Sequence, residues 1–391
     1  MTIETLAPEN SSLAGWIPQA STLGVYLHIP FCEKRCHFCS FVSGPYEPEA
    51  MDRFLSALHL EIDRYGEADW SSKVTIPSVF FGGGTPSLLT GEDLSGILDH
   101  LRKYFSIEPS AEITVECNPE SVSLEKLNVY RLAGVNRISL GVESLDDRLL
   151  SNLGRLHDAR GARNAYDAAR GAGFTNVSLD LMYGLPNLET SVWERTLGEA
   201  LAWNPEHLSC YGMTLDEGSL WGSKGVAGLP GEDEVVAQYW STVRLTGEAG
   251  YEHYEISNYA RPGLRSVHNQ IYWRGEEYLA LGPGASGFLG SVRFSNVKST
   301  ERYCSLLEAG QLPIGQSERL TPATHASDKI ILGLRLSEGV PLAWIRERFG
   351  SSRDTRLAEW NARRYIVREG EIIRLTEAGR LLSDSLFIEL L

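Results

Sequence analysis

The chain has 391 residues, of which 42% are hydrophobic, and it carries a formal net charge of -15. This length accommodates one large domain and a smaller one, and the negative charge argues against broad binding to nucleic acid, which needs clusters of Lys and Arg. No stretch approaches the ~20 apolar residues of a membrane-spanning helix, and the N-terminal residues lack the pattern of a secretory signal. We therefore expect a soluble, cytoplasmic protein that does not bind nucleic acid.

Up to residue 214, short apolar segments alternate with longer amphipathic segments, which is typical of a parallel sheet built from strand–helix units. The predicted strands cover residues 24–30, 78–83, 111–117, 137–142, 176–185 and 207–214. The predicted helices between them include residues 49–66, 91–105, 124–134 and 158–173. Six successive units with right-handed crossovers predict an α/β fold, an incomplete TIM-like (β/α)6 barrel, and an open doubly wound sheet is the weaker alternative.

Polar residues and glycines recur toward the C-terminal ends of the predicted strands, which form the functional face of such barrels. They are Gly82–Gly84, Glu116, Glu143, Asp180 and Thr214. Each one alone is explained equally well as a buried polar group that neighbouring backbone satisfies. Three acids at the same level of successive strands favour a site.

Three of the six cysteines, Cys32, Cys36 and Cys39, form a C-x3-C-x2-C pattern directly after the first predicted strand. Cysteine thiolates bind zinc or iron–sulfur clusters. Zinc would need His37 or a distant fourth ligand, and the sequence has no second C-x2-C or H-x3-H pair. A [4Fe-4S] cluster on three cysteines leaves one iron for a small chelating molecule, and the amino and carboxylate groups of S-adenosylmethionine suit that position.

The remaining sequence changes character twice. Residues 251–324 are rich in aromatic side chains, and the segments 330–340, 341–350 and 356–365 are predicted helices, followed by a hairpin over 365–376. This order predicts a winged-helix-like module. We divide the chain into an N-terminal segment (1–23), the barrel (24–250), an aromatic-rich extension (251–324) and a C-terminal module (325–391).

The chain resembles the radical S-adenosylmethionine HemN/HemW family in the motifs YLHIPFC, FFGGGTPSLL, VECNPE, NRISLGVES, DLMYGLP, LSCYGMT and YEISNYA. This family comprises oxygen-independent coproporphyrinogen oxidases and haem chaperones, and the resemblance covers most of the chain. It implies a radical SAM barrel that holds a [4Fe-4S] cluster on Cys32, Cys36 and Cys39 and binds S-adenosylmethionine.

By the same resemblance, a set of residues surrounds S-adenosylmethionine: Tyr26, Phe38, Gly83, Gly84, Thr85, Glu116, Arg155 and Asp180. Glycines let the backbone approach a ligand closely, Glu116 and Asp180 accept hydrogen bonds, and Arg155 pairs with a carboxylate. Glu143 departs from the family pattern, in which Gln is common. Glu143 is therefore expected either to contact the ligand or, alternatively, to pair with Arg155.

Three features favour the chaperone branch. The oxidases carry a further cysteine where this chain has Phe41, they have a longer segment before the cluster, and HNQIYW fits the H-N-x-x-Y-W motif of the chaperones. The motif implies His268 as a haem contact, since imidazole is a common axial ligand. The alternatives are a packed aromatic corner with a satisfied imidazole, or another histidine among His28, His37 and His253.

The predicted function is a haem chaperone whose partners are haem and haem-accepting proteins, membrane-associated acceptors among them, with dimerisation as a further expectation from the family. The alternative is an oxygen-independent coproporphyrinogen III oxidase or another radical SAM enzyme acting on a porphyrin-like substrate. In the C-terminal module, residues 341–380 hold nine Arg against six acids. That excess is too small for a DNA reader, and we expect a lid or docking domain whose arginines meet porphyrin propionates.

Overall fold

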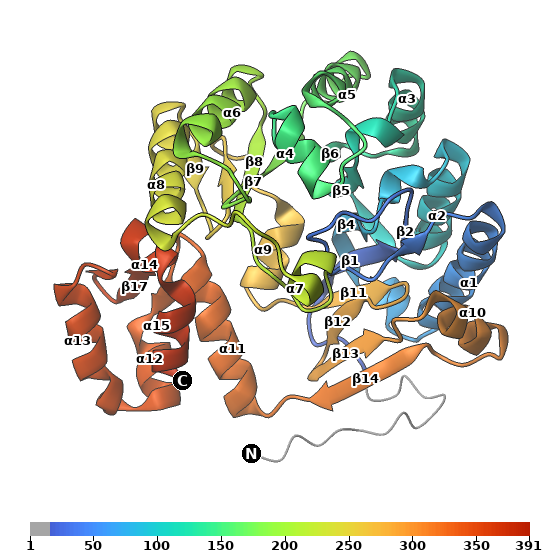
Figure 1. The fold of residues 1–391 in the computed structure, drawn as a ribbon. Coiled ribbons are helices and arrows are strands. Elements are labelled where there is room, and N and C mark those ends of the chain that lie inside the picture. The colour runs from blue at the N-terminus through green and yellow to red at the C-terminus, as the bar shows by residue number, and fades with distance from the viewer. Residues whose placement is uncertain (1–15) are drawn as a thin grey trace.

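The computed structural model describes residues 16–391, in which a curved twelve-stranded sheet forms the centre of the molecule (Figure 1). Its order is β14-β13-β12-β11-β1-β4-β5-β6-β7-β8-β10-β9. Six central strands are parallel: β1 (Thr22–Ile29), β4 (Thr75–Gly83), β5 (Ser106–Cys117), β6 (Arg137–Glu143), β7 (Val177–Tyr183) and β8 (His207–Gly212). They follow one another in chain order without the reversal that defines a doubly wound sheet. The incomplete (β/α)6 barrel is therefore confirmed.

Helices cover the outer, convex side of this sheet (Figure 1). They are α1 (Pro48–Gly66), α2 (Gly91–Tyr104), α3 (Leu124–Ala133), α4 (Asp147–Leu153), α5 (Ala159–Gly171), α6 (Thr190–Ala202) and α8 (Glu232–Glu248). Local sequence fixes where several of them begin. Thr90 and Asp93 form a capping box at α2, and the Asp146 carboxylate accepts hydrogen bonds from the first N–H groups of α4.

The central strands bury both of their faces, and the two faces differ in chemistry. Apolar side chains such as Leu140 belong to the main hydrophobic core with the outer helices. The intervening positions carry polar or small side chains, which point to the concave side. Strand register brings them level, because Glu116 pairs with Ser139 and Asp180 with Ser209. The alternation thus places a polar lining inside the barrel.

The sheet continues beyond both ends of the parallel barrel. On the β1 side lie β11 (Tyr278–Leu281), β12 (Ser286–Leu289), β13 (Val292–Asn296) and β14 (Ile314–Arg319), and on the β8 side β10 (Asn258–Ala260) and β9 (Glu252–His253). Strand β11 is parallel to β1, and the other additions are antiparallel. Helix α10 (Thr300–Glu308) packs on α1. Shorter elements are β2 (Phe31–Cys32), β3 (Gly44–Pro45) and α7 (Leu220–Lys224).

Helix α9 (Val267–Trp273) lies within the curve of the sheet (Figure 1). Its first turn is fixed by Glu112 of β5, whose carboxylate accepts hydrogen bonds from the N–H groups of Val267 and His268, both at 3.1 Å. A carboxylate at a helix N-terminus satisfies N–H groups that have no partner within the helix. The aromatic-rich motif is therefore held inside the incomplete barrel.

The C-terminal module has a hydrophobic core of its own. It consists of α11 (Pro322–Arg335), β15 (Val340–Pro341), α12 (Leu342–Phe349), α13 (Asp354–Ala362), β16 (Ile366–Glu369), β17 (Ile372–Leu375), α14 (Glu377–Leu381) and α15 (Ser383–Leu390). This helix, strand, helix, helix, hairpin order is that of a winged-helix-like domain. The helix predicted over 330–340 ends earlier, because α11 stops at Arg335 and residues 340–341 form a strand with β17.

The module docks against the β9 edge of the sheet and against α8. Glu377 bonds His253 of β9 at 2.6 Å, and Arg380 donates to the His253 carbonyl at 2.8 Å. The residue boundaries of the four predicted regions stay predictions, and residues 1–15 of the N-terminal segment lie outside the described residues. Within residues 16–391, no helix combines the length and the hydropathy needed to cross a bilayer.

Candidate functional site

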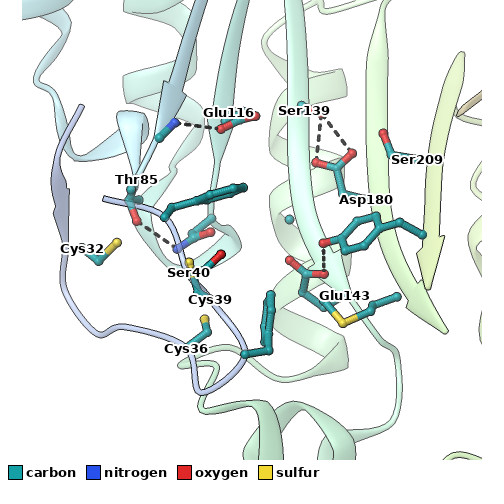
Figure 2. A pocket seen from close by; sticks show the side chains of 18 of the residues that line it. Cys32, Cys36, Cys39, Ser40, Thr85, Glu116, Ser139, Glu143, Asp180 and Ser209 are labelled. Atoms are coloured by element: carbon teal, nitrogen blue, oxygen red, sulfur yellow. Dashed lines mark hydrogen bonds between the residues drawn. The ribbon is translucent and has the colours of Figure 1, made fainter. Parts of the chain in front are cut away.

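A cavity of about 470 Å³ opens at the C-terminal ends of the parallel strands. Eleven of the residues predicted for the cluster and S-adenosylmethionine line it: Cys32, Phe38, Cys36, Cys39, Gly83, Gly84, Thr85, Glu116, Glu143, Arg155 and Asp180. We call it the cysteine cavity. Figure 2 shows the three cysteines on one side of it and the acids of the strand ends on the other.

The loop that carries the cysteines is fixed by contacts to distant parts of the chain. The His37 N–H donates to the Leu153 carbonyl at 2.9 Å, Ser40 donates to Asp216 at 2.8 Å, and Arg35 donates to the Gly218 carbonyl at 3.0 Å. The loop also begins in β2, which pairs with β3. These contacts hold the three thiols against the strand ends.

The cysteines suit a cluster shared by several thiolates. All three are free of disulfide bonds. Within residues 16–391, no three His, Cys, Asp or Glu side chains are arranged to hold one metal ion. A [4Fe-4S] cluster takes each thiolate on a different iron, so its cysteines do not have to converge on one point. Three free thiols around one cavity therefore fit this group.

Charge in the cysteine cavity is balanced by Arg155, whose Nη1 donates to the Cys36 sulfur at 3.5 Å. Burial raises the pKa of the Cys36 thiol, and the Arg155 charge opposes that rise. Arg155 also pairs with Glu143 at 3.8 Å, which confirms the alternative role expected for that residue. The Tyr211 hydroxyl donates to Glu143 Oε2 at 2.6 Å.

The backbone at Glu143 is strained. Its φ is 63°, in the left-handed region that non-glycine residues seldom adopt, and the β6–β7 register shifts between Gly141 and Glu143. Such strain persists where surrounding contacts impose it and is frequent at functional sites. The shift turns the Glu143 carboxylate toward Arg155 and Tyr211.

The glycine motif closes the opposite wall. Gly83 has a φ of 112°, and its N–H donates to Glu116 Oε2 at 3.2 Å. A Cβ on Gly84 would lie 2.5 Å from the Phe31 carbonyl oxygen, so a side chain cannot be accommodated there. Thr85 accepts a hydrogen bond from Asn118 at 3.2 Å. The strand end therefore presents backbone to the cavity.

The two remaining acids, Glu116 and Asp180, are half-buried at the wall of the cavity. Burial, followed by the charge of Asp180, raises the pKa of Glu116 to about 8. Burial also raises the pKa of Asp180, which accepts from the Ser139 hydroxyl at 3.0 and 3.2 Å (Figure 2). Two such carboxyls accept hydrogen bonds from ammonium or hydroxyl groups, and a cationic ligand stabilises their ionised forms.

Two of the predicted residues lie elsewhere. Tyr26 lines a neighbouring second cavity, where its hydroxyl bonds His28 at 3.1 Å. His268 has no exposed surface, and its two ring nitrogens bond Ser78 of β4 at 3.0 Å and Tyr272 at 2.7 Å. Burial and then the Arg137 charge lower the pKa of His268 to about 3, so it is neutral. The structure thus contains the satisfied imidazole described by the alternative explanation.

The rival histidines are also engaged. His28 bonds the Val42 carbonyl through Nε2 at 2.7 Å, besides its contact with Tyr26. His37 bonds the Asn152 carbonyl through Nδ1 at 2.8 Å. His253 bonds both Glu377 and the Ile256 carbonyl.

Sequence reasoning missed several residues of the cysteine cavity: Asn118, Arg137, Ser139, Ser209, Tyr211 and Asp216. Arg137 and Ser139 occupy alternate positions of β6, and Ser209 and Tyr211 occupy alternate positions of β8. The period of two in RISLG and LSCYG was a signal for Arg137, Ser139, Ser209 and Tyr211. No comparable signal existed for Asp216, which reaches the cavity from a loop.

Comparisons with known proteins agree with this geometry. The Radical SAM superfamily model matches residues 26–199, and the HemN C-terminal domain model matches residues 320–382. The chain is 33% identical to the heme chaperone HemW of Bacillus subtilis, over 93% of this chain and 97% of that protein. It is 36% identical to the heme chaperone HemW of Mycobacterium tuberculosis, over 94% of each.

A solved structure gives the same fold. The coproporphyrinogen III oxidase HemN of Escherichia coli, described as a radical SAM enzyme, matches with a TM-score of 0.83 at 23% identity, covering 94% of this chain and 90% of that chain. At this identity the likeness concerns the fold alone. The sequence matches establish that the chain belongs to the radical SAM HemN/HemW family, within its HemW group.

Proposed function

We propose that this protein is a haem chaperone of the radical SAM type, which binds a [4Fe-4S] cluster, S-adenosylmethionine and haem and passes haem to acceptor proteins. The observation that carries the proposal is an identity of 33–36% to proteins named heme chaperone HemW, over 93–94% of the chain. The oxidase relative contributes the fold and no more.

In this proposal Cys32, Cys36 and Cys39 hold the cluster. A bound cluster supplies one iron that has no protein ligand and can take up an amino acid moiety. Arg155 offers a positive charge to a carboxylate beside that position, and the backbone at Gly83 approaches the ligand closely. These residues bind and orient the ligand in the cavity.

Further residues complete the proposed S-adenosylmethionine site. Glu116 and Asp180 accept hydrogen bonds from its amino or hydroxyl groups, and Thr85 adds a hydroxyl. Phe38 adds an aromatic surface in the cysteine cavity, and Glu143 acts through Arg155. The carboxyl of Glu116, with a pKa of about 8, becomes an acceptor when it ionises or when a cationic ligand lowers that pKa.

Phe41 supports the chaperone over the oxidase. Its side chain is 61% exposed and lines both the cysteine cavity and the second cavity. The oxidases of the family carry a cysteine at this position, and a phenyl ring has neither a thiol for redox chemistry nor a metal-binding atom. Its aromatic face suits a porphyrin ring.

Haem transfer requires acceptor proteins, and membrane-associated haem proteins are included among the proposed acceptors. A homodimer is part of the proposal on family grounds. The cytoplasm, where thiols stay reduced, is the proposed location because the cluster needs three thiolates.

Two assays on one preparation test the function. The anaerobically reconstituted protein is incubated with dithionite, S-adenosylmethionine and coproporphyrinogen III, and separately titrated with haem. We expect stoichiometric haem binding and no protoporphyrinogen. A haem-loaded sample is then mixed with an apo-haem protein, and transfer is followed by the change in the Soret band.

The two assays separate the candidate functions. Turnover of coproporphyrinogen III would establish the oxidase instead. Failure of the protein to bind haem would rule out the chaperone function. A Cys36→Ala variant serves as the control for cluster-dependent turnover.

A further inference from the structure

The second cavity, about 590 Å³ in volume, lies between the cysteine loop, the β11–β13 extension and helix α11. Six aromatic side chains line it: Tyr26, Phe41, Tyr272, Trp273, Tyr278 and Phe288. Its volume is in the range of pockets that enclose whole organic ligands, and aromatic walls suit a flat ring system. The cavity shares Ser40 and Phe41 with the cysteine cavity, so the cysteine loop separates the two sites.

Several polar atoms of the second cavity have no hydrogen-bond partner. The Nε2 of His325, a residue of α11, is buried and has no hydrogen-bond partner, and the same holds for the Nε1 of Trp273 and the Nε of Arg293. Buried polar atoms are nearly always hydrogen-bonded, because leaving one unpaired costs about 1–3 kcal/mol. Three of them around one cavity indicate that a ligand completes the site.

The imidazole of His325 is held in place by its surroundings. Its ring packs edge-on against Phe288 with 5.4 Å between the ring centroids. His28 also lines this cavity, but both of its nitrogens are bonded. Among the histidines of the cavity, His325 therefore carries the nitrogen that is available to a ligand.

The geometry points to the second cavity as the binding site of an iron porphyrin, with His325 Nε2 as the axial ligand of the iron and Tyr272 and Trp273 as part of the wall. The inference rests on the proposed function, because it takes haem as the cargo. A neutral imidazole nitrogen is a usual ligand of haem iron.

With this assignment, the residues of the HNxxYW motif have different roles: Tyr272 and Trp273 line the second cavity, and His268 does not. His268 points into the barrel interior, where Ser78 and Tyr272 occupy its two nitrogens. To reach an iron it would have to break both hydrogen bonds and leave a site with no exposure. The histidine instead fixes the Tyr272 hydroxyl at 2.7 Å and so positions the wall of the second cavity.

Arg293 gives the cavity a charged edge. It pairs with Glu318 at 2.7 Å and with Asp328 at 3.3 Å. These acids balance the charge of the guanidinium, so a haem propionate can pair with Arg293 only by competing with them. The iron–imidazole bond and the aromatic walls thus carry the inference.

The test is a titration of full-length reconstituted protein with ferric haem. His325→Ala is compared with the wild type and with His59→Ala, a control at a histidine of α1 that does not line the second cavity. We expect His325→Ala to weaken haem binding by at least about tenfold, as loss of a metal-site residue does, and to shift the Soret band. Free imidazole should restore the wild-type spectrum of His325→Ala. Iron-free protoporphyrin should bind both proteins equally, because it has no iron to ligate.

The outcomes are distinct. A wild-type spectrum and affinity in His325→Ala would overturn the assignment while leaving the proposed function intact. Absence of haem binding by the wild-type protein would overturn both. Loss of iron-free protoporphyrin binding in His325→Ala, without rescue by imidazole, would make His325 a packing residue and would also overturn the assignment.

Discussion

The two cavities on either side of the cysteine loop are built on different principles. In the cysteine cavity, the acids are tied to neighbouring strands and to Arg155, so the polar atoms hold one another in place. In the second cavity the walls are aromatic, and the polar atoms without partners include an imidazole nitrogen, whereas in the cysteine cavity they are the Nε atoms of Arg137 and Arg155. The first is a preorganised polar site, and the second is suited to enclose an apolar ring system.

The largest effect is expected from the loss of one cysteine of the cysteine cavity, which should leave the second cavity unaffected. Replacing Cys36 by Ala should reduce iron and sulfide in the reconstituted protein to background, because two thiolates do not hold the cluster. Haem affinity in the second cavity should remain unchanged. Iron analysis and a haem titration measure both quantities, with Cys304→Ala, at a cysteine that lines neither cavity, as the control. Parallel loss of haem binding would show that the two sites are one.

The second-largest effect is expected at the buried ion pair of Arg155 and Glu143, which balances charge in the cysteine cavity. Arg155→Met should destabilise the protein by about 3–5 kcal/mol, because it leaves the buried Glu143 carboxylate with no opposite charge and only the Tyr211 hydroxyl as a partner. Urea unfolding followed by circular dichroism measures this loss. The double variant with Glu143→Gln should recover part of it, since the uncompensated charge is gone. Additive losses in the double variant would contradict the pairing.

The third prediction concerns the neutral imidazole between the two cavities. The folded-state pKa of His268 is about 3, below the ordinary value of 6.5, so the unfolded chain binds the extra proton first. Stability is therefore lost as the pH falls from 6.5 toward 3. Between pH 7 and pH 5 the wild-type protein should lose about 2 kcal/mol more than His268→Gln.

The slope of the unfolding free energy against pH, measured for the wild type and for His268→Gln, tests this prediction. Arg137 is the charged group that acts on His268, and its charge is constant over this range. Equal slopes for wild type and His268→Gln would mean that the imidazole is accessible to protons, as an iron ligand would be.

The smallest effect is expected at Phe41, on the boundary of the cavities. Phe41→Ala should weaken haem binding by about 0.5–1.5 kcal/mol, the usual contribution of an aromatic contact. Stability should change by less than about 0.5 kcal/mol, because the side chain is 61% exposed. Phe41→Tyr keeps the ring and should bind haem like the wild type. If Phe41→Ala binds haem as tightly as the wild-type protein does, Phe41 does not contact the ligand of the second cavity.

The sequence by itself determined the barrel and the cysteines, glycines and acids that line the cysteine cavity. Strands and helices alternate regularly, and the carboxyl ends of parallel strands meet at one edge of the sheet, so Glu116 and Asp180 could be placed together from their positions alone. The cysteine spacing indicated the loop that is proposed to hold the cluster, because its three cysteines lie within eight residues.

Tertiary structure alone decided the second cavity and the direction of His268. The walls come from the cysteine loop, α9, β11–β13 and α11, which are separated by up to hundreds of residues and packed together without any repeating pattern. A motif names the residues of α9 but does not say which of them faces the barrel. That choice depends on Glu112, Ser78 and Tyr272, whose hydrogen bonds to His268 exist only once the sheet has curved around the helix.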